Sequence, residues 1–204
     1  MTAQRDDWFP TPIWHFDIPN HELLNNELLK AIYAERQRDT QGVSWSNALG
    51  WHSKNDLHLY PDLYPEFQAI AKIAITNALE SGQEIGFDLT RFTMIMTNCW
   101  AVINPKFASN FVHNHPNSVL SGVYYLKAAE NSGGIFFRDP RDVAHMFMPS
   151  LTELTPWTIQ KITYKATEGK MIIFPSWLNH GVEPNLSEEE RVCISFNISM
   201  THQP

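Results

Sequence analysis

The chain has 204 residues, of which 43% are hydrophobic and 12% are aromatic, and this content is enough for one domain with a substantial core. Its 15 basic and 22 acidic residues give a formal charge of −7, which argues against extensive binding to nucleic-acid phosphates. No apolar run approaches the roughly 20 residues that span a bilayer, so we expect no membrane segment.

The N-terminal part of the chain is predicted to be mostly helical, with a single longer strand. Residues 13–18 alternate apolar and polar side chains, which is typical of a half-buried strand. Apolar residues recur at helical spacing over 21–37 and predict an amphipathic helix. A second such helix is expected over 62–81, ended by Gly82. Residues 39–60 between the helices predict a loop with one or two short strands.

After residue 86 the pattern changes to short β-rich runs separated by Gly, Pro, Asn and Ser. The predicted strands are 92–95, 98–103, 119–126, 134–137, 157–164, 171–174, 178–182 and 192–198. Such a series after two helices suggests a sandwich or barrel braced on one side by helices. No repeat or linker divides the chain. We therefore expect one domain over 1–204, with helix and strand support in 1–85 and a β core over about 86–200.

The last predicted strand separates two kinds of side chain. Arg191, Cys193, Ser195 and Asn197 share one face, while Val192, Ile194, Phe196 and Ile198 form an apolar face on the other side. Such a strand is expected to divide a cavity from a packing layer. Tyr124 and Tyr125 also alternate, so only one of them can face the cavity.

The two cysteines, Cys99 and Cys193, lie in apolar strand-like runs. We interpret each as a small buried hydrophobic side chain in a reducing compartment. No charged-then-apolar leader opens the chain. These features together predict a cytoplasmic protein.

Three histidines and one arginine form the pattern that points to chemistry. His113 and His115 are two apart, so on an extended backbone both imidazoles leave the same face. His180 follows the apolar run 171–174, and Arg191 opens the next apolar run. Two near histidines, a distant histidine and a following arginine suggest a non-haem metal site with an anion-binding arginine beside it.

Other polar or aromatic residues leave more than one interpretation open. His52 and His58 could approach a site, but we interpret them as surface or satisfied core histidines. Trp100 could line a cavity or belong to the core. Arg138, Asp139 and Arg141 could hold a substrate near the mouth or form ordinary loop salt bridges.

A set of short motifs occurs in a fixed order in the second half of the chain. The motifs are H-x-H-P at 113–116, S-G-V-Y-Y-L at 121–126, the glycine pair at 133–134, F-P-S-W-L-x-H at 174–180, the arginine at 191 and S-F-N at 195–197. The ordered set resembles the iron(II)- and 2-oxoglutarate-dependent oxygenases, in particular a little-characterised bacterial and phage subgroup with H-x-H-P and F-P-S-x-L-x-H segments. The resemblance covers roughly residues 95–199, about half of the chain.

This resemblance implies a mainly β fold with flanking helices, built on a double-stranded β-helix (jelly-roll, cupin-like) core whose mouth holds Fe(II). His113 would take the first histidine of the H-x-D/E…H metal triad, and His180 the distal one. Arg191 would bind the far carboxylate of 2-oxoglutarate, and Tyr125 falls where prolyl hydroxylases carry a tyrosine that contacts the same carboxylate. Asn197, on the strand face of Arg191, is the remaining expected cofactor contact.

The departure from the family pattern is His115, which stands where the triad has Asp or Glu. Three neutral imidazoles leave the metal a dication, and they suit Zn, Ni and Cu as well as Fe(II). Three alternatives stay open. His115 could be the third metal ligand. A water molecule could instead occupy the third coordination position, with His115 near the metal but not bound to it. A carboxylate such as Asp139 could also complete the triad.

The resemblance implies a dioxygenase, most simply a hydroxylase of unknown substrate, with 2-oxoglutarate and O2 as small-molecule co-substrates. The alternatives are a cupin-like metal-binding protein or isomerase that does not use 2-oxoglutarate, and a binding module that has lost oxygen chemistry. No membrane or nucleic-acid partner is expected. A homodimer could form through an exposed barrel edge or the first helix.

Overall fold

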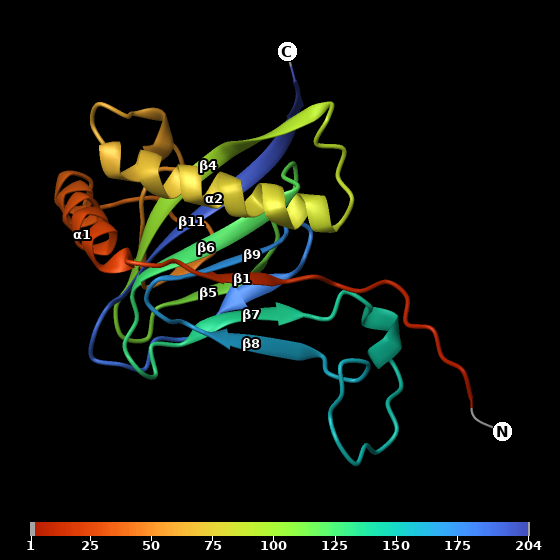
Figure 1. The fold of residues 1–204 in the computed structure, drawn as a ribbon. Coiled ribbons are helices and arrows are strands. Elements are labelled where there is room, and N and C mark those ends of the chain that lie inside the picture. Colours follow the sequence, from red (N-terminus) through yellow and green to blue (C-terminus); the bar gives the residue numbers. More distant parts are fainter. Residues whose placement is uncertain (1–2, 204) are drawn as a thin grey trace.

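The computed structural model describes residues 3–203, so the two ends of the expected 1–204 domain lie outside the described residues. Two antiparallel sheets are present in this part of the chain (Figure 1). The larger sheet has the order β1 (Trp14–Asp17), β9 (Lys170–Pro175), β6 (Leu120–Lys127), β11 (Arg191–His202), β4 (Phe92–Asn104) and β3 (Trp51–His52). The smaller sheet has the order β2 (Asn47–Ala48), β5 (Ser109–His113), β10 (His180–Val182), β7 (Gly134–Arg138) and β8 (Lys161–Lys165).

From β4 onward the chain passes repeatedly between the two sheets. The larger sheet holds the consecutive neighbours β9-β6-β11-β4, and the smaller one holds β5-β10-β7-β8. Four strands lie in each of two facing sheets, and successive strands alternate between the sheets except for the hairpin of β7 and β8, which is the arrangement of a double-stranded β-helix. The expected jelly-roll core with flanking helices is therefore confirmed.

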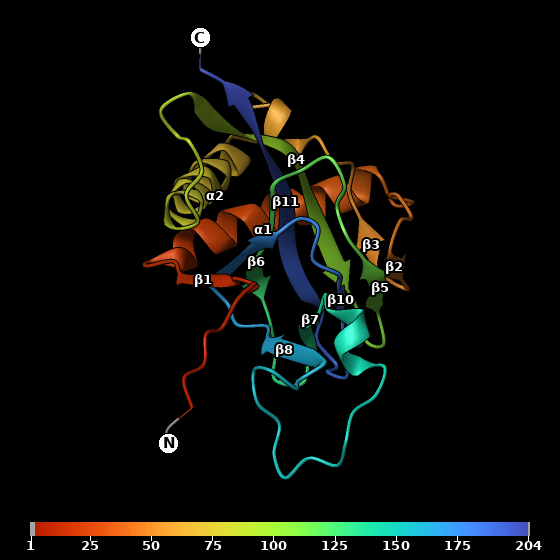
Figure 2. The ribbon, with the colours of Figure 1, turned by 90° about the vertical axis from the view of Figure 1, so that its right-hand side faces the viewer.

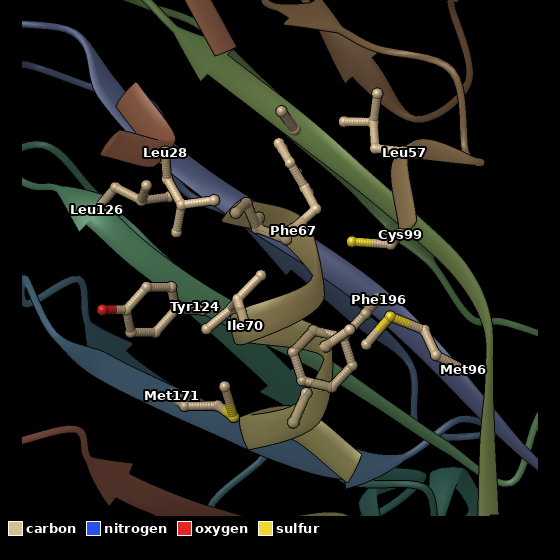
Figure 3. Packing of buried hydrophobic residues seen from close by; sticks show 14 of the residues in the cluster. Leu28, Leu57, Phe67, Ile70, Met96, Cys99, Tyr124, Leu126, Met171 and Phe196 are labelled. Carbon is tan, nitrogen blue, oxygen red and sulfur yellow. The ribbon is translucent and has the colours of Figure 1, made fainter. Parts of the chain in front are cut away.

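The two helices, α1 (His21–Arg38) and α2 (Pro65–Glu84), cover one face of the larger sheet (Figures 1 and 2). Phe67 and Ile70 of α2 pack with Met96 of β4 and Phe196 of β11 in the cluster that Figure 3 shows. A second cluster, which includes Val123 and Phe137, fills the space between the two sheets. The larger sheet is thus buried on both faces.

Strand β11 divides these layers as its sequence predicts. Val192, Ile194, Phe196 and Ile198 are at most 1% exposed and belong to the helix-side cluster. The alternate residues Arg191, Cys193, Ser195 and Asn197 line a cavity between the sheets. The tyrosine pair divides in the same way, because Tyr125 lines the cavity while the hydroxyl of Tyr124 donates to Asn25 Oδ1 of α1 at 2.5 Å.

The predicted ends of the second helix are wrong at both sides. The helix begins at Pro65 rather than at residue 62, because the ring of a proline disfavours helical backbone at the preceding residue. Gly82 does not end the helix but lies inside it, where an added Cβ would collide with the methyl group of Met94. The chain turns at Gly86, whose φ of +82° is in the left-handed region that glycine adopts readily.

Several strand boundaries differ from the prediction. The expected strands 92–95 and 98–103 are one strand, β4, with a register shift opposite Asn197 and Ile198. Strand β5 is missing from the series of predicted strand ranges, although His113 and His115 were expected on an extended backbone, and it pairs with β2 and β10. The expected strand over 157–164 is shorter and later, at Lys161–Lys165.

None of the helices in residues 3–203 has the length and apolar character needed to cross a membrane.

Candidate metal centre and cofactor pocket

A cavity of about 480 Å³ lies between the two sheets. Strand β5 and the residues after it form one wall, and β11, β4 and β6 supply the facing wall. His113, His115, His180 and Arg191 all line it. The structure therefore brings together the four residues that the motif analysis singled out, although the chain places His113 and Arg191 far apart in sequence.

Two of the histidines are direct neighbours across a β ladder. His113 at the end of β5 pairs with His180 at the start of β10, and their ring centroids lie 4.4 Å apart. Cross-strand partners on one face of a sheet bring their side chains into contact range. The ladder itself therefore sets the distance between these two imidazoles.

The third imidazole is placed by a backbone hydrogen bond rather than by a strand. His115 lies just beyond β5, and its N–H donates to Ser176 O at 2.9 Å. Its ring centroid lies 4.9 Å from that of His113 and 5.1 Å from that of His180. One ligand atom from each of the three residues lies within 4.8 Å of the others, an arrangement that could hold a metal ion.

The hydrogen bonds of two rings fix which nitrogen faces the cluster. Nδ1 of His113 donates to Phe111 O at 2.7 Å, and Nδ1 of His180 donates to Leu178 O at 2.8 Å. A carbonyl oxygen can only accept, so each Nδ1 carries the proton and each Nε2 carries a lone pair. Backbone carbonyls in this role orient metal-binding histidines and raise their basicity.

Burial keeps these rings neutral. Burial, together with the neighbouring imidazole of His113, lowers the pKa of His180 to about 3 and that of His115 to about 4. Burial also lowers the pKa of His113. Neutral imidazole is the form that binds a metal, so near pH 7 the cluster requires no deprotonation before metal binding.

Arg191 is buried at 1% exposure and carries an unpartnered donor. Its Nη1 donates to Ser132 O and, at 3.3 Å, to Glu183 O. Its Nη2 is buried with no hydrogen-bond partner among the described residues. Burial lowers the pKa of Arg191, but guanidinium remains charged at neutral pH. An uncompensated buried cation of this kind fits an anionic ligand.

The acidic residues beside Arg191 in sequence bind other partners. Glu188 pairs with Lys106, Glu189 with Lys127 at 3.0 Å, and Glu190 with Arg36 at 2.8 Å. None of these three neighbouring carboxylates therefore pairs with Arg191.

Tyr125 and Asn197 line the same cavity but differ in their contacts. Asn197 Oδ1 accepts from Ser121 Oγ at 2.8 Å, and its Nδ2 donates to Asn98 Oδ1 at 3.3 Å. Tyr125 is 1% exposed, and burial raises the pKa of its phenol. The phenol therefore stays protonated and can donate a hydrogen bond to an anion.

Asp139 lies in a different place from the histidine cluster. Its carboxylate accepts from Arg141 at 2.7 Å and from His145 at 3.0 Å, beside a second cavity. The loop salt bridge is thus the arrangement that the structure shows for Asp139 and Arg141. The carboxylate of Asp139 is not part of the histidine cluster that could hold a metal ion.

His52 differs from its interpretation as a surface or satisfied core histidine, because it lines the cavity. It stacks on Trp100, with centroids 5.4 Å apart and an interplanar angle of 14°. Trp100 in turn lies 5.7 Å from the ring of His115. His58 is outside the cavity, where its Nε2 contacts Met96 O at 3.1 Å.

Comparison with known proteins gives a match in the same region. A protein-family model described as "Putative 2OG-Fe(II) oxygenase" matches residues 98–197, just under half of the chain and the part that carries the histidine cluster and Arg191. No curated protein is similar enough in sequence to match.

Solved structures of similar fold cover nearly the whole chain. A prolyl-4-hydroxylase from Pseudomonas putida superposes with a TM-score of 0.63 and 12% identity over 93% of this chain and 92% of its own. HygX from Streptomyces hygroscopicus, with nickel, 2-oxoglutarate and hygromycin B bound, has a TM-score of 0.63 and 11% identity over 93% and 83%. A Trichoplax adhaerens prolyl hydroxylase in complex with a hypoxia inducible factor peptide fragment has a TM-score of 0.61 and 12% identity over 92% and 83%.

At these identities the solved structures establish the fold alone. The family match adds the chemistry, and it falls on the residues whose side chains form the cavity. Residues 98–197 of the chain therefore match the 2-oxoglutarate- and iron(II)-dependent oxygenases, a family whose cofactors are Fe(II) and 2-oxoglutarate.

Proposed function

We propose that this chain is a 2-oxoglutarate-dependent hydroxylase in which His113, His115 and His180 bind Fe(II) and Arg191 binds 2-oxoglutarate. One observation carries the proposal. Three neutral imidazoles and one buried guanidinium nitrogen without a partner line the same cavity. The two kinds of group match the two cofactors, a soft-to-intermediate divalent metal and a dicarboxylate.

The donor set fits a divalent metal. The ladder pair His113 and His180 offers two oriented Nε2 lone pairs, and His115 offers a third nitrogen within 4.8 Å. Three neutral ligands leave the full charge of a dication at the site. Doubly negative 2-oxoglutarate would neutralise that charge, so the replacement of a carboxylate by His115 is compatible with this cofactor.

The cavity also offers groups for the far end of 2-oxoglutarate. Arg191 Nη2 is a donor without a partner, and the protonated phenol of Tyr125 is a second donor in the same cavity. We assign both to the distal carboxylate. Asn197 already has partners for its amide, so its role is to hold the Ser121 hydroxyl and the adjoining wall in place.

Bound Fe(II) and 2-oxoglutarate supply the oxidising chemistry, in which O2 oxidises a substrate C–H bond while 2-oxoglutarate is decarboxylated to succinate. The chain's own residues perform three tasks around them. The histidines hold the metal, Arg191 orients the co-substrate, and apolar residues such as Val123 and Phe174 exclude water from the reacting centre.

Turnover of 2-oxoglutarate tests the proposal without a known substrate. Purified protein is reconstituted with Fe(II) under argon, exposed to O2, and assayed for succinate with Fe(II) present or removed by chelator. Slow, iron-dependent succinate formation that Arg191→Met abolishes is the expected result. Metal binding with no 2-oxoglutarate binding or turnover would contradict the proposal and favour a cupin-like metal-binding protein.

We also infer that the protein works in the reducing environment of the cytoplasm. Both cysteines are free and buried, and neither is placed to form a disulfide. Free buried thiols are typical of reducing compartments.

A further inference from the structure

One wall of the cavity is not used by the metal or by 2-oxoglutarate. It is formed by β3 and the residues that follow it, and it carries His52, stacked on Trp100, and Asn55. His52 pairs with Val102 in the β3–β4 ladder, so its side chain is held on the cavity side of the sheet. This wall adjoins the metal centre, since Trp100 lies between His52 and the ring of His115.

His52 presents a hydrogen-bond acceptor to this wall. Its Nδ1 lies 2.5 Å from Ser53 O, and because a carbonyl oxygen can only accept, Nδ1 carries the proton. Nε2 of the neutral ring therefore carries a lone pair, and it has no hydrogen-bond partner among the described residues. Asn55 adds a second acceptor, because its Oδ1 is buried and also unpartnered. Two unsatisfied acceptors on one wall call for a ligand that donates hydrogen bonds.

The cavity offers no partner for a charged substrate. Among the described residues that line it, Arg191 is the only one with a permanent charge, and no Asp, Glu or Lys is present. A charged group moved from water into such a site loses hydration without gaining a counter-ion. The one cation is already matched by the dicarboxylate of the co-substrate. The remaining space therefore favours an uncharged molecule.

Two exposed aromatic side chains stand at the rim of the same cavity. Trp45 is 72% exposed and Phe111 is 65% exposed, and both line the opening. The backbone segments that carry them are neighbours, since Phe111 N donates to the carbonyl of Ser46, the residue after Trp45, at 2.8 Å. Large exposed aromatic rings at a cavity mouth are typical of ligand contacts rather than of solvated surface.

We propose that this wall is the subsite for the primary substrate, and that it takes an uncharged molecule with a hydroxyl or N–H group that donates to His52 and an apolar ring face that packs on Trp45 and Phe111. The inference rests on the proposed function for the position of the reacting metal. The cavity, at about 480 Å³, is at the small end of the range for ligand pockets. Only the reacting end of a larger substrate therefore enters it, while the rest lies against the aromatic rim.

Four small probes of matched shape test the proposal. Benzyl alcohol carries a donor, benzyl methyl ether lacks one, benzoate is an anion and benzylammonium is a cation. Each is titrated by NMR into protein loaded with Ni(II) and 2-oxoglutarate. We expect the alcohol to bind about threefold to tenfold more tightly than the ether, the range of one net hydrogen bond, and both charged probes to bind more weakly than the alcohol.

Two variants separate the roles of the wall and the rim. His52→Phe keeps a ring on Trp100 but removes the acceptor, and it should abolish the preference for the alcohol over the ether. Trp45→Ser, at an exposed position that the fold does not need, should lower the affinity for both neutral probes by the same factor, so the ratio of the two affinities stays the same. His15→Phe is the matched control, because His15 is exposed on β1 and does not line the cavity, and it should change neither the affinities nor their ratio.

Equal binding of the alcohol and the ether to the native protein would overturn the proposal, as would tighter binding of either charged probe. A preference for the alcohol that survives in His52→Phe would also overturn it. Metal content and 2-oxoglutarate affinity are measured on the same samples. If the native protein bound neither cofactor, the proposed function would fail, while the alcohol-to-ether ratio would still decide the assignment of His52.

Discussion

His113 and His180 face each other directly in the β5–β10 ladder, with ring centroids 4.4 Å apart and each Nδ1 donating to the carbonyl two residues before it. The same short-range hydrogen bond is therefore built twice, on neighbouring strands. It leaves both Nε2 atoms as acceptors in the cavity. This pairing explains how a fold of two sheets can orient two imidazoles so that they could bind a metal, with no contribution from the metal itself.

Replacement of His180 by alanine should remove metal binding. Loss of a hydrogen bond behind a metal-binding histidine already costs ~10–100-fold in affinity, so loss of the ligand itself should cost at least ~100-fold. Metal content after loading with Fe(II) under argon, measured by mass spectrometry of the metal, checks this result. His15→Ala is the control, because His15 is exposed on β1. Full metal content in the His180 variant would remove this residue from the site.

Replacement of Arg191 by methionine should weaken 2-oxoglutarate binding far more than metal binding. Truncation of one partner of a buried charge pair typically costs ~2–5 kcal/mol, which corresponds to a loss of at least ~30-fold in affinity. Calorimetric titration of the Ni(II)-loaded protein with 2-oxoglutarate measures the change. The control is Arg36→Met, which breaks only the partly exposed pair with Glu190.

The variant also loses the hydrogen bonds of Arg191 to Ser132 O and Glu183 O, so thermal unfolding is recorded alongside. Parallel loss of metal, 2-oxoglutarate and stability would mean that the arginine only supports the fold.

The apolar pattern of the strands was sufficient to predict a sandwich or barrel braced by helices, and the resemblance to the oxygenases specified the jelly-roll core. It failed where pairing between distant strands overrides a local signal. Thr97 interrupts the apolar runs and suggested a break, yet β4 is continuous because β11 pairs with it along its whole length. Asn197 pairs with Asn98 and Ile198 with Met96, so Thr97 is the extra residue of a β-bulge. Thr97 therefore marks a real irregularity, but that irregularity is a bulge within one strand and not a break between two strands.

The site could be anticipated only in part, for a related reason. His113, His115 and His180 occur in motifs of recognisable order, and Arg191 begins a strand whose two faces differ in polarity. His52 has no such context, since it lies in an irregular stretch and reaches the cavity only because β3 pairs with β4. Tertiary pairing of a two-residue strand leaves almost no trace in a single sequence. Similarly, β5 is short and polar, and its strand conformation depends on pairing with β2 and β10.

The close packing of Gly122 against Phe196 should show as a coupling between the two positions. A Cβ on Gly122 would collide with the ring of Phe196, which is 1% exposed. Gly122→Ala should therefore destabilise the protein by ~1–3 kcal/mol through overpacking. Phe196→Leu shortens the opposing side chain, so the double variant should lose less stability than the sum of the two single variants. Urea unfolding of all four proteins measures the cycle, and simple additivity would contradict the contact.

The thiol of Cys193 should be unreactive at neutral pH although it lines the cavity. Burial raises its pKa to about 11, and the charge of Arg191 only partly opposes that shift. The unfolded thiol has a pKa near ~8.5, so at pH 8 the native thiolate fraction should be at least ~100-fold lower. Alkylation with iodoacetamide, followed by peptide mass spectrometry, should be slow at pH 8, rise with pH toward 11, and become rapid in denaturant. Rapid labelling of the native protein at pH 8 would show that Cys193 is less buried than it is here.

His115→Asp is the change that distinguishes the three arrangements of the third metal position. The backbone N–H of His115 bonds to Ser176 O, so the substitution leaves the main chain in place. If the imidazole is a ligand, aspartate restores the carboxylate of the family pattern and metal binding persists. The new negative charge reduces the charge of the site from two to one, so the affinity for doubly negative 2-oxoglutarate should fall. His115→Ala, which supplies no ligand, should lose metal instead.

Metal content and 2-oxoglutarate affinity of both variants, measured on the same preparations, decide among the alternatives. Unchanged metal content in His115→Ala would mean that a water or another residue holds the third position. A lower stability of both variants with unchanged metal and 2-oxoglutarate binding would limit His115 to packing on Trp100. Because the two variants differ by one carboxylate at a fixed backbone position, a gain of metal binding from His115→Ala to His115→Asp can come only from a side chain that reaches the metal.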